Sequence, residues 1–259
     1  MTASAVASDD RTVAWSSPER APLLRWLIFT GATVFAGFLL WRYGLVARMF
    51  ESDRTHISSV IGALYVGASL HCLWRTLAIT REGELERKAT TTIEAAGANA
   101  IVLDDGSVEG QGPLPSGLVG AHIRDLALKA RAQGARRLDQ TLLLRGLADR
   151  LRGSNGFGGF ASDTLMKLGL LGTIIGFIIM LAPIAGLDAS DKTTMKASMG
   201  LMSDGMAVAM YTTLAGLVGS ILLKIQYYML DGATSALFSR AVRLTETRVV
   251  PALERRYDR

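Results

Sequence analysis

The residues of this chain that could do chemistry are small or carry a hydroxyl, and they recur at helical intervals within apolar stretches. The stretch LGLLGTIIGF, residues 168–177, holds one group: Gly169, Gly172, Thr173 and Gly176. A second group follows further along the chain: Ala209, Thr213, Gly216 and Ser220, with Thr212 beside them. Residues three or four apart share one face of a helix. Such faces let two membrane helices approach closely and offer hydroxyls to a partner's polar group.

Two interpretations of these faces fit the spacing. The first is ordinary packing between the helices of one subunit, and the second is the wall of a path for an ion. No Asp or Glu lies within the four apolar stretches of the chain, although an ion that crosses a bilayer needs a charged or protonatable group there. The chain therefore conducts no ion, or it forms one part of a path whose ion-carrying residue belongs to another protein.

The four apolar stretches have the lengths of membrane spans. Hydrophobic residues make up 49% of the 259 residues, and the mean hydropathy is +0.28. The stretches cover residues 26–41, 57–74, 168–187 and 205–223, and charged or polar residues bound each of them. A helix of about 20 apolar residues crosses a bilayer. We therefore predict an all-α, polytopic membrane protein with four transmembrane helices and long cytoplasmic helical extensions, including a mixed-charge helix at residues 81–88.

Basic residues predict the orientation. Residues 81–152 hold eleven Lys and Arg and residues 231–259 hold six, against two in the connection 188–204. The positive-inside rule places both termini and the middle region in the cytoplasm. We expect the following organisation along the chain. Residues 1–22 form a disordered cytoplasmic tail, residues 23–79 form transmembrane helices 1 and 2, and residues 80–163 form a cytoplasmic region. Residues 164–231 form transmembrane helices 3 and 4, and residues 232–259 form a cytoplasmic amphipathic helix. Ser162 or Asp163 is the expected N-cap of the third transmembrane helix.

Several classes of function are disfavoured. The net charge of +5 and the pI near 9.6 follow from cytoplasmic arginines, and no basic stretch is interleaved with the stacking aromatics that nucleic-acid binding needs. The sequence has no phosphate-binding loop, no Cys/His metal cluster and no nucleophile elbow, so we expect no enzyme, no cofactor and no metal site. Cys72 is the only cysteine and is interpreted as a buried packing residue. His71, near the end of the second span, is interpreted as an interfacial residue rather than a proton relay.

The two motifs together resemble a known family. LGLLGTIIGF at 168–177, followed after a polar connection by GMAVAMYTTLAGL at 205–217, is similar in order, spacing and orientation to the MotA/TolQ/ExbB proton-channel family. The likeness covers about residues 160–230. Four spans resemble the flagellar stator subunit more than the three-span TolQ and ExbB type. Val208 stands where TolQ and ExbB relatives tend to have a glutamate.

The resemblance implies a function and partners. Family members form a pentamer around the single membrane helices of a MotB/TolR/ExbD-like partner dimer, which carries an essential aspartate. Thr173 and Thr213, with Thr212 beside them, would line the ion path in a bacterial inner membrane. The chain would then be the channel-forming subunit of a stator-like rotary motor that couples ion flow, of H+ or of Na+, to rotation or force on the partner. The alternative is a structural or assembly membrane protein without ion conduction.

Overall fold

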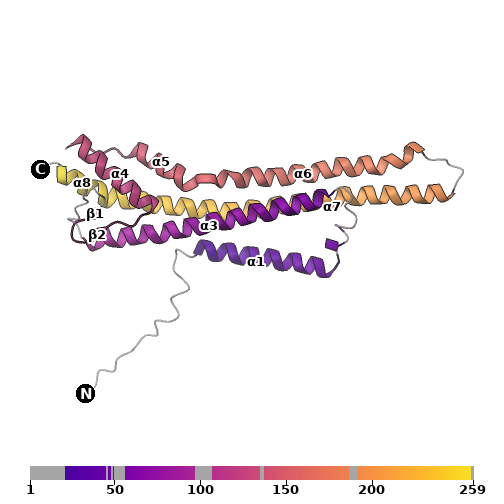
Figure 1. The fold of residues 1–259 in the computed structure, drawn as a ribbon, viewed down its shortest axis with the longest axis horizontal. Helices are drawn as coiled ribbons and strands as arrows, with labels where there is room; N and C mark the ends of the chain where they lie inside the picture. Colours follow the sequence, from indigo (N-terminus) through magenta and orange to yellow (C-terminus); the bar gives the residue numbers. More distant parts are fainter. Residues whose placement is uncertain are drawn as a thin grey trace, which may run out of the picture. The chain divides into compact units, whose positions relative to one another are not determined.

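The chain is predominantly helical. The computed structural model describes residues 21–44, 46, 47, 49, 56–96, 107–134, 137–186 and 192–257. The predicted disordered tail, residues 1–22, lies outside these residues apart from the last two, which begin the first helix. In chain order the elements are α1 (Ala21–Arg42), α3 (Ile57–Ala95), β1 (Ser107–Val108), β2 (Gly112–Pro113), α4 (Leu118–Gln133), α5 (Thr141–Arg152), the 3₁₀ turn η2 (Gly153–Asn155), α6 (Gly156–Leu181), the 3₁₀ turn η3 (Ala182–Gly186), α7 (Lys192–Leu244), the π-helical turn η4 (Thr245–Val249) and α8 (Val250–Tyr257) (Figure 1).

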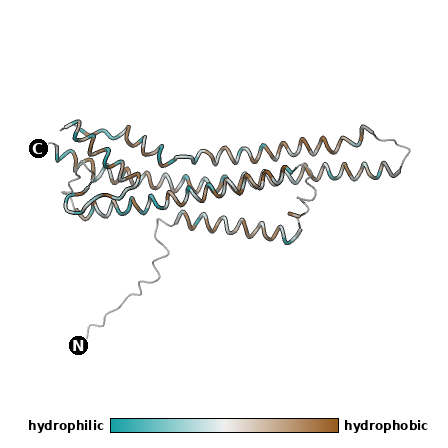
Figure 2. The backbone as a smooth tube through the Cα atoms, in the orientation of Figure 1, coloured by the Kyte–Doolittle hydropathy of each residue, from teal (hydrophilic) through white to brown (hydrophobic). Residues whose placement is uncertain are grey.

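The all-α, polytopic fold is confirmed. Four helical segments are long and apolar enough to cross a membrane: Pro22–Arg42, Ile57–Ala95, Thr141–Ile184 and Met195–Arg256. Figure 2 shows hydrophobic residues along α1 and α6, and more hydrophilic ones around α4 and α8. Within the described residues the only strands are β1 and β2, which form a two-stranded antiparallel hairpin. The chain is therefore a multi-pass membrane protein.

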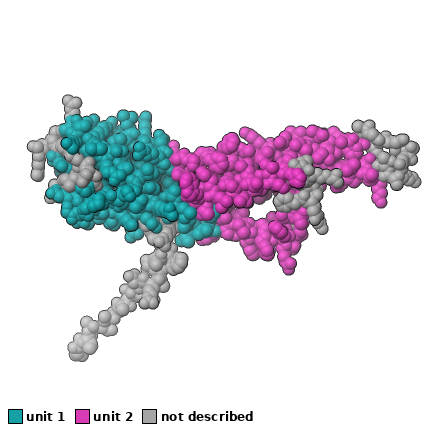
Figure 3. All heavy atoms as spheres, in the orientation of Figure 1, with its two compact units in different colours: residues 1–27, 76–151, 233–259 teal, residues 28–75, 152–232 magenta. Residues whose placement is uncertain are grey.

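The chain divides into two compact units (Figure 3). Unit 1 comprises Met1–Leu27, Thr76–Leu151 and Ala233–Arg259, and unit 2 comprises Ile28–Arg75 and Arg152–Gly232. The division falls within two helices, after Arg75 in α3 and after Gly232 in α7, and both helices are continuous there. Each of them therefore contributes residues to both units. The apolar stretches of the sequence lie mainly in unit 2, and the charged middle region and tail lie in unit 1.

In unit 1, α3 continues far beyond its apolar stretch. The mixed-charge residues 81–88 are helical, as expected. Buried residues recur on one face of this part of the helix, at Ile79, Glu86 and Ile93. A repeat of seven residues keeps one stripe of a helix against its neighbours. This stripe explains why the helix persists although its other faces are charged.

The core of unit 1 also holds α4 and α8. Ile123 and Leu126 on α4 and Leu253 on α8 are almost completely buried. Two carboxylates fasten the chain around them: Glu82 Oε2 accepts a hydrogen bond of 2.8 Å from the amide of Leu118, and Glu254 Oε1 accepts one of 2.9 Å from the amide of Leu138. Glu82 thereby satisfies an amide at the first residue of α4, where negative charge is favoured.

Three helix limits differ from the sequence-based expectation. The helix α7 begins at Lys192, inside the stretch expected to be a connection, and it passes residue 231 without a break. Residues 232–244 therefore prolong the fourth membrane helix, and only α8 follows as a separate α-helix. The expectation that Ser162 or Asp163 caps the third membrane helix is wrong, because α6 already begins at Gly156.

Candidate functional site

Three of the glycines of α6 face α7 in unit 2 along the middle of the helix, where the two helices lie side by side (Figure 1). Gly169, Gly172 and Gly176 are all buried. A Cβ atom added to Gly169 would lie 3.2 Å from the Cα of Gly216, and one added to Gly176 would lie 2.6 Å from the amide nitrogen of Ala209. Real Cβ atoms essentially never lie as close to another heavy atom as one would at Gly176, and the distance at Gly169 is tighter than most real Cβ contacts. Glycine at these positions therefore allows a backbone-to-backbone contact that a side chain would prevent at Gly176 and hinder at Gly169.

The α7 side of this contact is equally close. A Cβ atom on Gly216 would lie 2.7 Å from the carbonyl oxygen of Leu165 and 2.8 Å from the Cα of Gly169. At the other end of the contact, a Cβ on Gly205 would lie 2.8 Å from the carbonyl oxygen of Gly176. We call this contact, from Leu165 to Met180 on α6 and from Gly205 to Ser220 on α7, the glycine contact.

The threonine hydroxyls occupy two different environments at the glycine contact. Thr173 and Thr213 are half-buried. The hydroxyl of Thr173 donates to the carbonyl oxygen of Leu170 at 2.5 Å, and that of Thr213 donates to the carbonyl oxygen of Ala209 at 2.9 Å. Thr213 Oγ1 also lies 3.3 Å from the carbonyl oxygen of Gly169, across the contact. Both hydroxyl oxygens keep lone pairs that can accept a hydrogen bond from a visiting group.

Thr212 is enclosed between the helices. It is 0% exposed, and its hydroxyl donates to the carbonyl oxygen of Val208 at 2.8 Å. A Cβ atom on Gly172 would collide with the Thr212 hydroxyl and its Cβ. The structure thus places Thr212 opposite Gly172 as a packing partner, with its polar group satisfied by its own helix.

A serine pair closes one end of the glycine contact. Ser162 Oγ lies 3.0 Å from Ser220 Oγ and 3.1 Å from the carbonyl oxygen of Ser220, and both side chains are buried. Ser162 therefore joins α6 to α7 instead of capping α6. Beyond the serine pair, Lys224 Nζ and Asp163 Oδ1 are 4.0 Å apart, with both side chains more than half exposed. An exposed ion pair of this kind adds little stability.

The opposite faces of both helices are apolar and exposed. On α6 the side chains of Leu170, Ile174 and Phe177 are between 54% and 60% exposed. On α7 those of Met210 and Leu214 are 67% and 61% exposed. An apolar surface of this extent in a single chain is suited to lipid or to further helices. The pair α6–α7 therefore has a narrow, hydroxyl-bearing contact and a broad apolar exterior.

Comparison with protein families bears on this helix pair directly. Residues 138–241 match the sequence model of the MotA/TolQ/ExbB proton channel family. This segment, about two fifths of the chain, is similar to that family. No curated protein and no solved structure matches the chain.

The matched segment, residues 138–241, is longer than the two motifs on which the resemblance to the family rested. We call it the MotA/TolQ/ExbB segment. It includes α5, η2, α6 and most of α7, whereas the resemblance was expected to cover about residues 160–230. It therefore contains the whole glycine contact and all three threonines. Val208, the residue that departs from the glutamate of TolQ and ExbB relatives, is only 2% exposed. An apolar side chain fits that buried position without a polar partner.

A polar cluster near the start of α6 was not foreseen from the sequence. His71 on α3 lies with Nδ1 2.7 Å from Tyr227 Oη and with Nε2 3.0 Å from Ser154 Oγ. The ring of Tyr227 also packs over Gly158, where a Cβ atom would overlap the ring. Histidine and tyrosine here join α3, the turn η2 and α7 by side-chain hydrogen bonds.

Arg75 extends this cluster by one helical turn. Its Nε donates to Asn155 Oδ1 at 3.2 Å and its Nη2 donates to the carbonyl oxygen of Arg152 at 3.0 Å. Asn155 Nδ2 in turn donates to Asp231 Oδ1 at 2.9 Å. Gly153, between these groups, has a φ of +47°, a left-handed conformation that suits glycine at the end of a helix such as α5. The cluster fixes the point at which the chain enters α6.

The sequence held one signal for this cluster. His71 and Arg75 are four residues apart and so share a face of α3, which meets the polar residues of η2. Their partners lie about 80 and more residues away along the chain, beyond the reach of local pattern. His71 is thus engaged by two side chains of its own chain.

Proposed function

We propose that the chain is the channel-forming subunit of an ion-driven motor in a bacterial inner membrane. Several copies, forming a pentamer, surround the single membrane helices of a partner dimer. The partner supplies an aspartate that the ion binds, and ion flow is coupled to rotation of, or force on, the partner. The match of residues 138–241 to the model of a proton channel family supports the channel.

The observation that carries this proposal is the composition of the glycine contact. Its threonine hydroxyls are those of Thr173, Thr212 and Thr213, and the chain has no charged side chain between Leu168 and Gly186 or between Gly205 and Leu223. An ionised group entering such apolar surroundings is costly unless it is neutralised or hydrogen-bonded. A carboxylate from a partner would therefore become protonated, or would bind a cation, beside these hydroxyls.

The half-buried hydroxyls suit this step. Thr173 and Thr213 already donate to carbonyl oxygens of their own helices. Each can accept a hydrogen bond from a protonated carboxyl, or rotate to donate to an ionised one. Their oxygen atoms are also ligands of the kind that Na+ takes, so the arrangement serves either H+ or Na+. Thr212 is enclosed by Gly172, and we assign it to packing beside the path.

The exposed apolar faces have a place in the same arrangement. The large side chains of α6 and α7 would contact lipid and neighbouring copies of the chain. The helices α1 and α3 are the other two membrane spans. The arginine-rich residues of unit 1 then lie on the cytoplasmic side, in accord with the positive-inside rule. No catalytic chemistry and no cofactor enter this mechanism.

The proposal is tested by ion flux through the complete complex. The single-span partner is first isolated by co-purification with the full chain from the native membrane, and both are reconstituted in vesicles with a pH-sensitive or Na+-sensitive dye. Thr173→Val and Thr213→Val each remove a hydrogen bond to a charged group, worth about 1.5–3 kcal/mol, so flux should fall roughly tenfold or more.

Thr164→Val is the matched control. Thr164 lies on α6, is half-buried like Thr173, and donates to the carbonyl oxygen of Phe160 in its own helix, as Thr173 does to that of Leu170. Its removal should leave flux unchanged. Full flux in Thr173→Val and Thr213→Val would refute the assigned path. An absence of any partner-dependent flux in the unmodified complex would favour a structural or assembly protein instead.

A further inference from the structure

Unit 1 contains an open pocket that the ion path does not use. It has a volume of about 580 Å3 and lies between α3 and the end of α7. Its lining residues are Glu86, Arg87, Thr90, Glu94, Arg240, Arg243, Leu244, Thr247 and Arg248. Four arginines against two glutamates give this lining a surplus of two positive charges. Leu244 is the only apolar side chain among the residues that line it.

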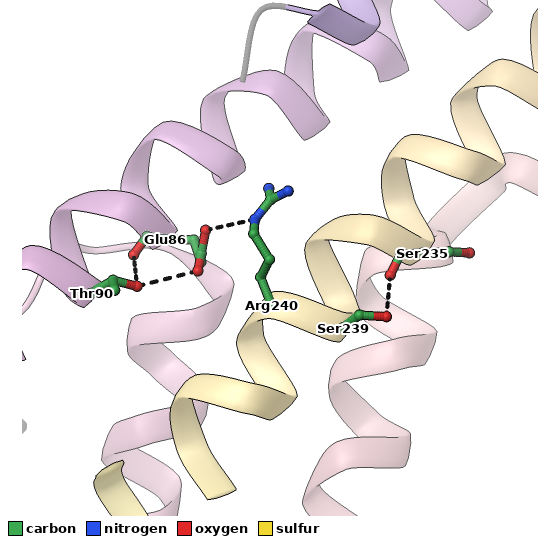
Figure 4. Close-up of polar contacts among 5 residues, drawn as sticks. All are labelled: Glu86, Thr90, Ser235, Ser239 and Arg240. Carbon is green, nitrogen blue, oxygen red and sulfur yellow. Dashed lines mark hydrogen bonds and ion pairs between the residues drawn. The ribbon is translucent and has the colours of Figure 1, made fainter. Parts of the chain in front are cut away.

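One arginine of the pocket is held in place by a buried carboxylate (Figure 4). Glu86 is 6% exposed, and its Oε2 accepts a hydrogen bond of 3.2 Å from Arg240 Nε. Its Oε1 accepts a bond of 3.2 Å from Thr90 Oγ1. Because Arg240 uses Nε for this pair, its two Nη groups remain as donors toward another acceptor. The pair orients the guanidinium group before any ligand arrives.

The π-helical turn brings a second arginine to the same side. In a regular α-helix Arg248 would lie roughly 80° around the axis from Arg240. The extra residue of a π turn removes about 100° of this rotation, which leaves the two within roughly 20° of one another. The turn spans Thr245–Val249, directly at the pocket. Turns of this kind are rare and frequently occur at functional sites.

Threonine hydroxyls stabilise the π turn from within. Thr245 Oγ1 donates to the carbonyl oxygens of Ala241 and Val242 at 3.1 and 3.0 Å, and Thr247 Oγ1 donates to that of Arg243 at 2.7 Å. These bonds satisfy carbonyl groups in the last turn of α7. The distorted turn is therefore built into the helix by its own side chains.

Two arginines of the lining have no acidic partner among the residues that the structure describes. The guanidinium groups of Arg243 and Arg248 are exposed and make no hydrogen bond or ion pair with any residue that the structure describes. Guanidinium groups bind phosphate oxygens through paired, parallel hydrogen bonds. The lining has no aromatic ring on which a base could stack. We propose that this pocket binds a compact phosphate-bearing anion through Arg240, Arg243 and Arg248.

The phosphate could reach the pocket as a free polyphosphate or as a lipid headgroup, and the test separates the two. The full chain is placed in phosphatidylcholine nanodiscs, and binding of inorganic pyrophosphate is measured by calorimetry. A double variant, Arg243→Ala with Arg248→Ala, should bind pyrophosphate at least about tenfold more weakly, since charge-assisted hydrogen bonds are lost. The variant leaves the Glu86–Arg240 pair intact, and circular dichroism confirms that it folds.

The matched control is Arg145→Ala with Arg150→Ala. Both arginines are exposed on α5 in unit 1 and neither lines the pocket, so pyrophosphate affinity should not change. A second variant acts in the opposite direction: Glu94→Gln removes a negative charge from the lining and should strengthen binding a few-fold. Weaker binding by Glu94→Gln, or equal losses in both double variants, would overturn the proposal.

The lipid source is examined in the same proteins. The chain is purified from membranes that contain phosphatidylglycerol, and the retained lipid is quantified by mass spectrometry. Retention that is lost in the Arg243/Arg248 variant and kept in the Arg145/Arg150 variant identifies a headgroup as the ligand. Arginine-dependent binding in either arm supports the site. Binding of neither pyrophosphate nor phosphatidylglycerol refutes it, and an acidic polypeptide then becomes the candidate occupant.

Discussion

The helix α7 meets its two neighbours in opposite ways. In unit 2 it contacts α6 through glycines, with backbone atoms where side chains would otherwise be. In unit 1 it contacts α3 through the ion pair of Arg240 with Glu86 and leaves a pocket of about 580 Å3 beside it. One helix thus combines a contact with almost no side chains and a contact made of long charged ones.

The surroundings explain the difference. In a bilayer the hydrophobic effect does not drive helices together, so close packing between small residues and internally satisfied hydroxyls must do so. In water a charged side chain keeps its solvation while its stem packs, so an arginine-lined pocket can exist at modest cost. The glycine contact therefore fixes a distance between helices, whereas the arginine pocket presents movable donors to a ligand.

The strongest way to break the glycine contact is to fill it. Gly172→Leu places a side chain where Thr212 lies, and the helices must separate. Overpacking of this kind costs about 3 kcal/mol or more. Gly159→Leu is the control on the same helix, since a Cβ there meets nothing within 4 Å. We expect hydrogen exchange of the α6 amides to accelerate in Gly172→Leu alone. Equal protection in both variants would contradict the contact.

The corresponding way to break the unit 1 contact is to remove one charge. Arg240→Ala leaves the Glu86 carboxylate buried with Thr90 as its remaining partner. The expected loss is about 2 kcal/mol, allowing for the solvent that reaches Arg240. It is measured by hydrogen exchange of the amides between Ile79 and Ile93.

Replacing both partners separates the pair from the packing. Glu86→Met with Arg240→Met removes the buried charge as well as its partner, and most of the lost protection should return. Lys224→Ala, which removes an exposed ion pair with Asp163, should change protection by less than about 0.5 kcal/mol. A double variant as unstable as Arg240→Ala would show that the charge itself is not the cause.

The sequence predicted which parts of the chain form helices in lipid, because apolar runs mark them. Runs of apolar residues reveal where a helix meets lipid, and all four spans are found as helices. Such runs do not reveal where a helix ends, because its backbone hydrogen bonds continue when lipid gives way to water. The helices α3 and α7 therefore extend well beyond their apolar stretches, and the buried stripe at Ile79, Glu86 and Ile93 sustains one of them.

Which partner each small residue meets depends on three-dimensional contact and could not be read from spacing. The pattern placed Thr213 on the face of small residues and Thr212 beside that face, without indicating which of the two side chains is enclosed. Only the approach of Gly172 shows that Thr212 is enclosed while Thr213 is half-buried. The bonds of His71 with Ser154 and Tyr227 join residues far apart in sequence, for which a single sequence holds no local signal.

The smallest effect that we expect is a dependence of the stability of unit 1 on pH, which the glycine contact should not share. His122 on α4 of unit 1 is 4% exposed, and burial lowers its pKa below the usual range, against opposing effects of Gln140 and Asp125. The unfolded chain binds the proton with a pKa of about 6.5, so below that pH it holds more protons than the folded chain. The stability of unit 1 should therefore fall as the pH drops through about 6.5 toward the lower pKa of the folded chain.

Hydrogen exchange, corrected for its intrinsic pH dependence, measures this loss in the amides of α4. His122→Gln should abolish it, because glutamine does not titrate. The residues of the glycine contact between Gly169 and Gly176 include no titratable side chain, so their protection should stay constant over the same range. If acid weakened the glycine contact and spared α4, the buried titrating group would lie in unit 2, and the contrast between a charge-free contact and a charged one would fail.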